Sequence, residues 1–157
     1  IYDCLVNEDQ DPREVVLKTE TPNLYLLPSC IDLAGAEVEL INRFRREYVM
    51  EAVIKQLADD YDFIIIDCLP SLGLITINSL TAADTVLVPV QCEFFALEGL
   101  AKLMDTIRTV KKMLNPKLQI EGILLSMYDR RLRLANEVID QVREFFKTQV
   151  FPVSDDI

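Results

Sequence analysis

Two short apolar runs stand out in the pattern of hydrophobic and polar positions along the chain. One is "YDFIIID" (61–67) and the other is "TVLVPV" (85–90), and both are rich in β-branched residues. Such runs, bounded by polar residues, are typical of strands buried on both faces of a parallel sheet. We therefore predict two buried strands there, and we expect further strands at 23–28, at 118–128 and, more briefly, at 149–153.

The segments between these runs carry apolar residues at three- and four-residue steps. This spacing predicts helices over 33–60, 96–114 and 135–148, and Asp11 before Pro12 predicts the start of a helical turn. Parallel strands need crossover connections, which helices usually supply. The alternation therefore predicts an α/β fold in one domain: a doubly wound, mostly parallel sheet with helices on both faces.

Composition removes several classes of function. The chain has 157 residues, half of them hydrophobic, and no histidine. It therefore cannot supply a Ser-His-Asp or Cys-His catalytic group. Its four cysteines are widely spaced, which argues against a metal site and favours a reducing, cytoplasmic setting. No apolar run approaches the roughly 20 residues that cross a bilayer.

The charge is unevenly distributed along the chain. The formal net charge is −10, but residues 1–101 hold 6 basic and 18 acidic residues, whereas 102–147 hold 10 basic and 6 acidic residues. The basic third of the chain fits either ordinary solvated helix faces or an anion-binding surface. Charge alone favours the solvated faces.

Asp67 is a candidate functional residue, because the most apolar run of the chain ends on this carboxylate. An unpaired buried carboxylate is costly, whereas the carboxyl ends of the strands in an open α/β sheet face the ligand crevice. An apolar strand that ends in Asp is the Walker B pattern of nucleotide-hydrolysing P-loop proteins, in which the carboxylate holds the Mg²⁺ shell. The alternative is an Asp that caps the following turn.

Longer stretches resemble one family. They are "LLPSCIDLAGAEVEL" (26–40), "DCLPSLGLITINSLTAADTVLVPVQCEFFALEGL" (67–100) and "LNPKLQIEGILLSMYDRRLRLANEVIDQV" (114–142). In their order and their residues, these motifs resemble those of the ParA/Soj family of partition ATPases, which are relatives of MinD. The resemblance implies a P-loop NTPase-like fold.

The chain departs from the family pattern in two ways. Leu69 stands at the second residue of the family's Cys-Pro-Pro, where the family has a proline, so the turn there has one fixed φ fewer. The glycine-rich loop with two lysines that wraps the phosphates in this family has no counterpart, because the four glycines are scattered. We therefore expect a ParA-like ATPase domain that is incomplete at both ends and lacks its N-terminal βαβ portion.

The resemblance assigns three residues to the phosphate end of the nucleotide. Asp67 would hold Mg²⁺ through its water shell. Ser71 and Gly73 lie in the segment that senses the γ-phosphate in this family, and Gly73 could permit a backbone rotation there.

Other positions match the dimer interface, the base pocket and the DNA-binding surface of the family. Gln91 follows a strand and matches the loop at the nucleotide-sandwich dimer interface, and the base-pocket candidates are Met127, Tyr128 and Asp129. The basic cluster after them matches the surface that contacts DNA phosphates without sequence preference. It comprises Arg130, Arg131 and Arg133.

The resemblance thus implies an ATPase for chromosome or plasmid partition that uses ATP and Mg²⁺. It would form a homodimer, bind nonspecific DNA on the nucleoid and respond to a ParB-type partner, with no membrane contact. Without a phosphate-binding loop, the chain as given would be inactive. The alternatives are a MinD-like ATPase, which would need a basic amphipathic C-terminal helix, and a non-catalytic interaction module that pairs through an exposed strand edge.

Overall fold

The computed structural model describes residues 1–68, 73–93 and 96–152, and these form two compact units, 1–82 and 83–157. Each unit is described by itself. Among the described residues, no helix combines the length and the apolar character that crossing a membrane requires.

The first unit is mainly helical. Its elements are α1 (Tyr2–Val6), a 3₁₀ turn (Pro12–Glu14), β1 (Leu17–Lys18), β2 (Tyr25–Leu26), α2 (Leu33–Glu39), two further 3₁₀ turns (Leu40–Asn42 and Arg46–Tyr48), α3 (Val49–Leu57) and α4 (Leu74–Ala82). Asp11 caps the turn at Pro12 as expected, because its side chain accepts a hydrogen bond from the N–H of Arg13. The core gathers apolar side chains from α1, α2, the 3₁₀ turn that follows α2, and α3. Its buried members are Cys4, Leu5, Ala36, Leu40, Val49, Met50 and Val53.

Two predictions for the first unit are wrong in part. The strand expected at 23–28 is only Tyr25–Leu26, and it pairs antiparallel with β1 in a short hairpin. The single helix expected over 33–60 is interrupted, because Arg43 is extended and Arg45 has a left-handed backbone with φ 55°. The tertiary contacts of Asn78, described below, fix the start of α3 and override the helical periodicity.

The buried strand predicted at 61–67 is also wrong. Residues 63–68 form no strand, and Phe63 and Ile65 are 89% and 91% exposed. A parallel strand needs hydrogen-bonding neighbours, and no other segment in the described part of the chain pairs with this run. The apolar run therefore remains unpaired.

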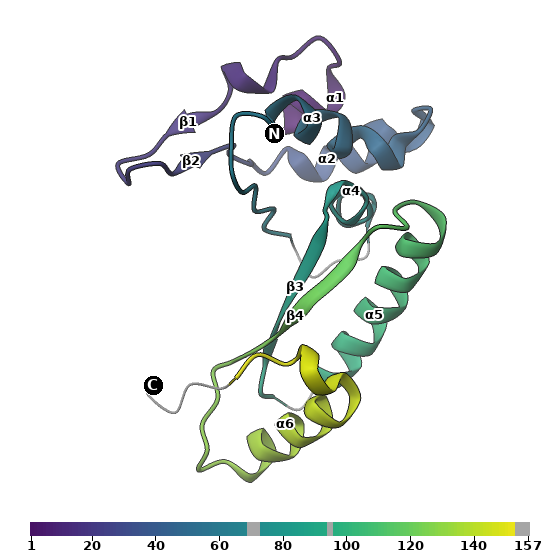
Figure 1. Ribbon diagram of the computed structural model, residues 1–157. Helices are drawn as coiled ribbons and strands as arrows, with labels where there is room; N and C mark the ends of the chain where they lie inside the picture. The colour runs from purple at the N-terminus through teal and green to yellow at the C-terminus, as the bar shows by residue number, and fades with distance from the viewer. Residues whose placement is uncertain (69–72, 94–95, 153–157) are drawn as a thin grey trace. The chain divides into compact units, whose positions relative to one another are not determined.

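The second unit contains the predicted parallel strands, but the strand at 85–90 is buried on one face only, since Val88 and Val90 are buried whereas Leu87 is 51% exposed. Its elements are β3 (Thr85–Gln91), α5 (Ala96–Met113), β4 (Gln119–Ser126), α6 (Arg133–Phe146) and a 3₁₀ turn (Lys147–Gln149). β3 and β4 lie side by side and are parallel, and α5 is the crossover helix between them (Figure 1). The strand expected at 149–153 is reduced to one parallel bridge between Ile123 and Val150. The chain thus has the α/β fold with a parallel sheet that the alternation of elements predicts.

Candidate functional site

Asp67 lies at the end of the unpaired run and its side chain is exposed. It forms no hydrogen bond or ion pair with the described residues, and these contain no group of three or more His, Cys, Asp or Glu side chains that could enclose a metal ion. Mg²⁺ is usually held by one or two carboxylates together with water and substrate phosphates. A single exposed carboxylate therefore fits a role in a magnesium water shell, with phosphate oxygens supplied by a nucleotide.

Ser71 lies outside the described residues, whereas Gly73 is placed directly before α4. The carbonyl of Gly73 accepts the first hydrogen bond of that helix, from the N–H of Ile77 at 3.1 Å. A side chain from another helix caps the start of α4: Oε1 of Glu37 in α2 accepts a hydrogen bond from the N–H of Ile75 at 3.2 Å. The predicted sensor glycine therefore lies against a carboxylate that sequence spacing did not indicate.

Asn78 ties α4 to the start of α3. Its side chain is fully buried; Oδ1 accepts from the N–H of Met50 at 3.1 Å, and Nδ2 donates to the carbonyls of Arg46 and Leu74 at 2.8 and 3.0 Å. Asn78 therefore has a structural role. It also explains why α3 begins where it does, since a buried amide satisfies the backbone groups at its N-terminus.

The residues predicted for the dimer interface and the base pocket lie together at one edge of the second unit. Gln91 is the last residue of β3 and pairs in register with Ser126, the last residue of β4. Met127 follows with a left-handed backbone, φ 52°, and is exposed. Tyr128 donates its hydroxyl hydrogen to Oδ1 of Asn136 at 2.7 Å, so α6 orients the tyrosine ring. The edge is the carboxyl end of both strands, where open α/β sheets bind ligands.

The three predicted DNA-contacting arginines are exposed but not equivalent. Arg131 forms a bidentate pair with Asp129, with Nη2 to Oδ2 at 2.7 Å, and this pair lowers the pKa of Asp129 to about 2. Arg133 pairs with Glu137 at 2.7 Å along α6. Arg130 has no carboxylate partner among the described residues. Its guanidinium is therefore the one most available to a phosphate.

Cys92 follows β3 and is buried, and burial raises the pKa of its thiol. A raised pKa suppresses the reactive thiolate. Cys92 therefore has the properties of a packing residue.

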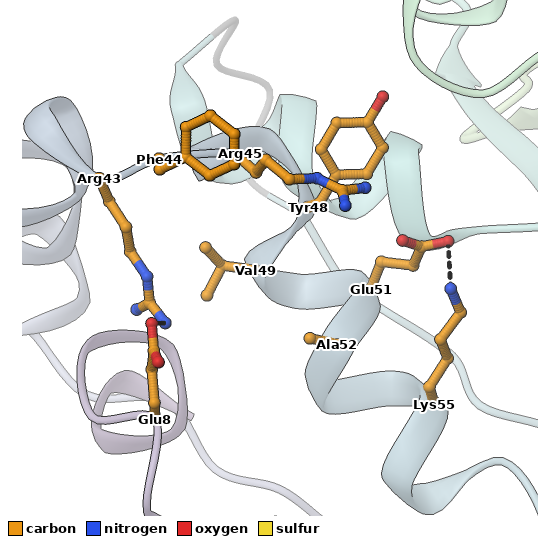
Figure 2. Close-up of a pocket in the computed structure, with 9 residues that line it drawn as sticks. All are labelled: Glu8, Arg43, Phe44, Arg45, Tyr48, Val49, Glu51, Ala52 and Lys55. Atoms are coloured by element: carbon orange, nitrogen blue, oxygen red, sulfur yellow. Dashed lines mark hydrogen bonds and ion pairs between the residues drawn. The ribbon is translucent and has the colours of Figure 1, made fainter.

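The structure contains a pocket that sequence reasoning did not anticipate. It lies in the first unit between Glu8, the segment 43–48 and α3, with a volume of about 320 Å³, and Figure 2 shows its lining. Two of its cations are neutralised, because Arg43 pairs with Glu8 and Lys55 pairs with Glu51. The guanidinium of Arg45 stacks over the ring of Tyr48 at 4.7 Å. None of the predicted site residues lines this pocket.

Comparison with known proteins then decides the family. The model of a family described as "AAA domain" matches residues 1–120. The chain belongs to this AAA-domain family. Its relatives include the chromosome partitioning protein ParA of Myxococcus xanthus, 52% identical over 153 residues, which are 98% of this chain and 54% of the relative. The sporulation initiation inhibitor protein Soj of Bacillus subtilis is 48% identical over 151 residues, 96% of this chain and 59% of the relative.

Within the AAA-domain family, the resemblance to ParA and Soj is therefore confirmed. The chain spans little more than half the length of the curated relatives that it matches. A solved structure with a similar fold is cobyrinic acid a,c-diamide synthase from Mycobacterium smegmatis with a bound ATP analogue and magnesium. It has a TM-score of 0.85 and 39% identity, over 93% of this chain and 59% of that one. A plasmid partition protein from Borrelia burgdorferi also has this fold, with a TM-score of 0.80, 25% identity, and coverage of 96% of this chain and 60% of that one.

Proposed function

We propose that this chain is the Asp67-bearing part of a ParA/Soj-type partition ATPase that uses ATP and Mg²⁺. The observation that carries the proposal is the 52% identity to a chromosome partitioning ParA across nearly the whole chain. The exposed carboxylate of Asp67 at the end of an apolar run supports it, because a magnesium water shell requires such an oxygen ligand. The ATP analogue and magnesium in a similar solved structure agree with this chemistry.

The chain as given lacks the groups that neutralise a triphosphate. Its four glycines are scattered, so no glycine-rich loop with lysines can surround the phosphates. We propose that such a loop belongs to a longer polypeptide and that its strand pairs with the unpaired run 61–67. In the intact protein this run would then be buried, and Asp67 would face the phosphates.

ATP hydrolysis by the protein translated from the complete gene tests this proposal. We expect slow Mg²⁺-dependent hydrolysis, and we expect Asp67→Asn to reduce it by about a hundredfold, since one charged group at a phosphoryl-transfer site has effects of that order. Asp62→Asn is the matched control, because Asp62 is also exposed and lies at the other end of the same run. The proposal is wrong if the complete protein does not bind ATP, or if both variants retain full activity.

Binding of ATP to the chain as given is a second measurement. Isothermal titration with ATP and Mg²⁺ should show no micromolar binding, because the phosphates would meet a single carboxylate and no cationic loop. Micromolar affinity would contradict the proposed division of the site between two parts of a longer protein.

We further propose that the intact ATPase dimerises with ATP and binds DNA without sequence preference through the arginines after β4, under the control of a ParB-type partner. Since Arg130 has no carboxylate partner among the described residues, Arg130→Ala should weaken DNA binding more than Arg131→Ala. Each lost phosphate contact should also reduce the slope of log affinity against log salt by about one. Lys117→Ala, in the turn between α5 and β4, is a control that removes a cation elsewhere in the unit.

A further inference from the structure

Gly73 has no room for a side chain. A Cβ built at this position would lie 2.1 Å from Oε1 of Glu37 and 2.9 Å from its Cδ. Both distances are well below van der Waals contact, and the obstacle is the carboxylate that also caps α4. Any residue other than glycine would therefore displace either Glu37 or the start of the helix.

The close approach of Glu37 gives a reason for glycine at this position besides the backbone freedom that the sequence suggested for it.

Glu37 supplies the side-chain cap that Gly73, without a side chain, cannot provide. An N-cap side chain normally accepts a hydrogen bond from the second or third N–H of its helix. Gly73 occupies the N-cap position without a side chain, and the Glu37 carboxylate accepts from the N–H of Ile75 instead. A negative charge at this end of α4 also interacts favourably with the helix dipole. Glu37 is itself held in place, because its neighbour Ala36 is fully buried in the core.

We infer that Glu37 is a positioning residue for the phosphate-sensing end of α4: its carboxylate fixes Gly73 and the first turn of the helix against α2. This inference rests on the proposed function and on the place of Gly73 in the γ-phosphate-sensing segment that the family resemblance implies. Glu37 does not contact the nucleotide in this role. It sets the position of the backbone that would respond to the third phosphate, and Asn78 anchors the same helix on its other side.

The test compares ATP with ADP in the complete protein, because only ATP carries the γ-phosphate. Glu37→Ala should lower the ratio of ATP affinity to ADP affinity by about fivefold, the effect of losing one helix cap, and leave ADP affinity unchanged. Glu37→Gln keeps an oxygen that can accept from Ile75, so it should restore most of the ratio. Glu39→Ala is the control on the same helix, since Glu39 accepts only from the exposed Tyr2 hydroxyl.

An equal loss of ATP and ADP affinity, or no loss, would overturn the inference, because a merely structural residue does not distinguish the two nucleotides. If the complete protein binds neither nucleotide, the proposed function is wrong. The melting temperatures of the chain as given then test whether Glu37 holds Gly73. Gly73→Ala should displace the Glu37 carboxylate and lower Tm by about 2–4 °C, the effect of losing one helix cap in a chain of this size, and by less than half as much when Glu37 is already alanine. Equal effects in the two backgrounds would show that Glu37 does not hold Gly73.

Discussion

The runs 61–67 and 85–91 have similar apolar composition but different structures. β3 is a strand paired along its length with β4, with one register shift between Val86 and Leu87, and Val88 and Val90 are almost completely buried. Residues 63–68 form no strand and are unpaired, with Phe63 and Ile65 exposed. Strand propensity is therefore not sufficient, because a strand forms only where a partner supplies the hydrogen bonds and the buried surface.

The two units also differ in what stabilises them. In the second unit a backbone ladder between β3 and β4 fixes the register. In the first unit the described sheet is limited to one hairpin, whose two strands have two residues each. Side chains connect the helices of this unit instead. The chief connections are Asn78 between α4 and α3 and Glu37 between α2 and α4. Substitutions of single side chains should therefore affect the first unit most strongly.

The largest effect is expected for Asn78→Ala. This change leaves the Met50 N–H and the Arg46 carbonyl without their buried partner. Each buried unsatisfied group costs about 1–3 kcal/mol, so the free energy of unfolding of the first unit should fall by about 3 kcal/mol or more. Hydrogen exchange at the amides of Val53 and Leu57 measures this loss, with the amides of β3 as an internal reference.

Ser79→Ala is the matched control for Asn78. Ser79 is also buried on α4, but its hydroxyl donates only to the carbonyl of Ile75 in the same helix. Its removal should cost about 1 kcal/mol or less. Equal losses for the two variants would show that Asn78 does not connect the helices.

A second pair of variants compares the two apolar runs directly. Val88→Ala removes a side chain that is 3% exposed and should cost about 2 kcal/mol. Ile65→Ala removes a larger side chain that is 91% exposed, and it should change the free energy of unfolding by less than about 0.5 kcal/mol. Urea unfolding of the chain as given measures both values. A loss at Ile65 as large as that at Val88 would show that the run 61–67 is buried.

A third pair concerns the close packing in the second unit. A Cβ at Gly122 in β4 would lie 2.4 Å from the Phe151 ring and 2.9 Å from the carbonyl of Gln149. Gly122→Ala should therefore cost about 2 kcal/mol. Gly99 in α5 has nothing within 4 Å of its Cβ position, so Gly99→Ala should stabilise by about 1 kcal/mol through helix propensity. A stabilising alanine at 122 would contradict the packing, and thermal melting distinguishes the two signs.

The sequence predicted the elements that depend on local pattern or on partners within the chain. β3, β4, α5 and α6 are confirmed, because their periodicity and their neighbours are both present in residues 85–146. The break near Arg45 was missed, because it is imposed by Asn78, 33 residues away, and no periodicity shows such a contact. The unpaired run 61–67 was missed because its composition describes a strand and says nothing of its partner.

In the candidate site, too, the sequence predicted what local pattern determines and missed what a distant contact determines. Residues that follow strand ends, such as Gln91 and Met127, were brought to one edge as parallel strands require. The partner of Gly73 was missed, since Glu37 lies far away in sequence on a helix whose charged residues resemble an ordinary solvated face. The one available signal was a glycine directly before a helix that has no capping side chain of its own.

The smallest expected effect concerns the pair Asp129–Arg131 at the edge of the second unit. The pKa of Asp129 is lowered from its ordinary 3.8 to about 2, first by the hydrogen bond from the Arg131 side chain and then by that from its backbone N–H. A lowered pKa means that the pair contributes stability above pH 3.8, and that this contribution is lost as the pH falls towards 2.

The carboxyl carbon of Asp129, followed by NMR, should titrate near 2 in the natural chain and move towards 3.8 in Arg131→Ala. Arg130→Ala is the control and should leave this titration unchanged, because Arg130 does not pair with Asp129. A shift of equal size in both variants would mean that the general charge of the arginine cluster, and not the bidentate contact, lowers the pKa; Arg131 would then be as available to phosphate as Arg130.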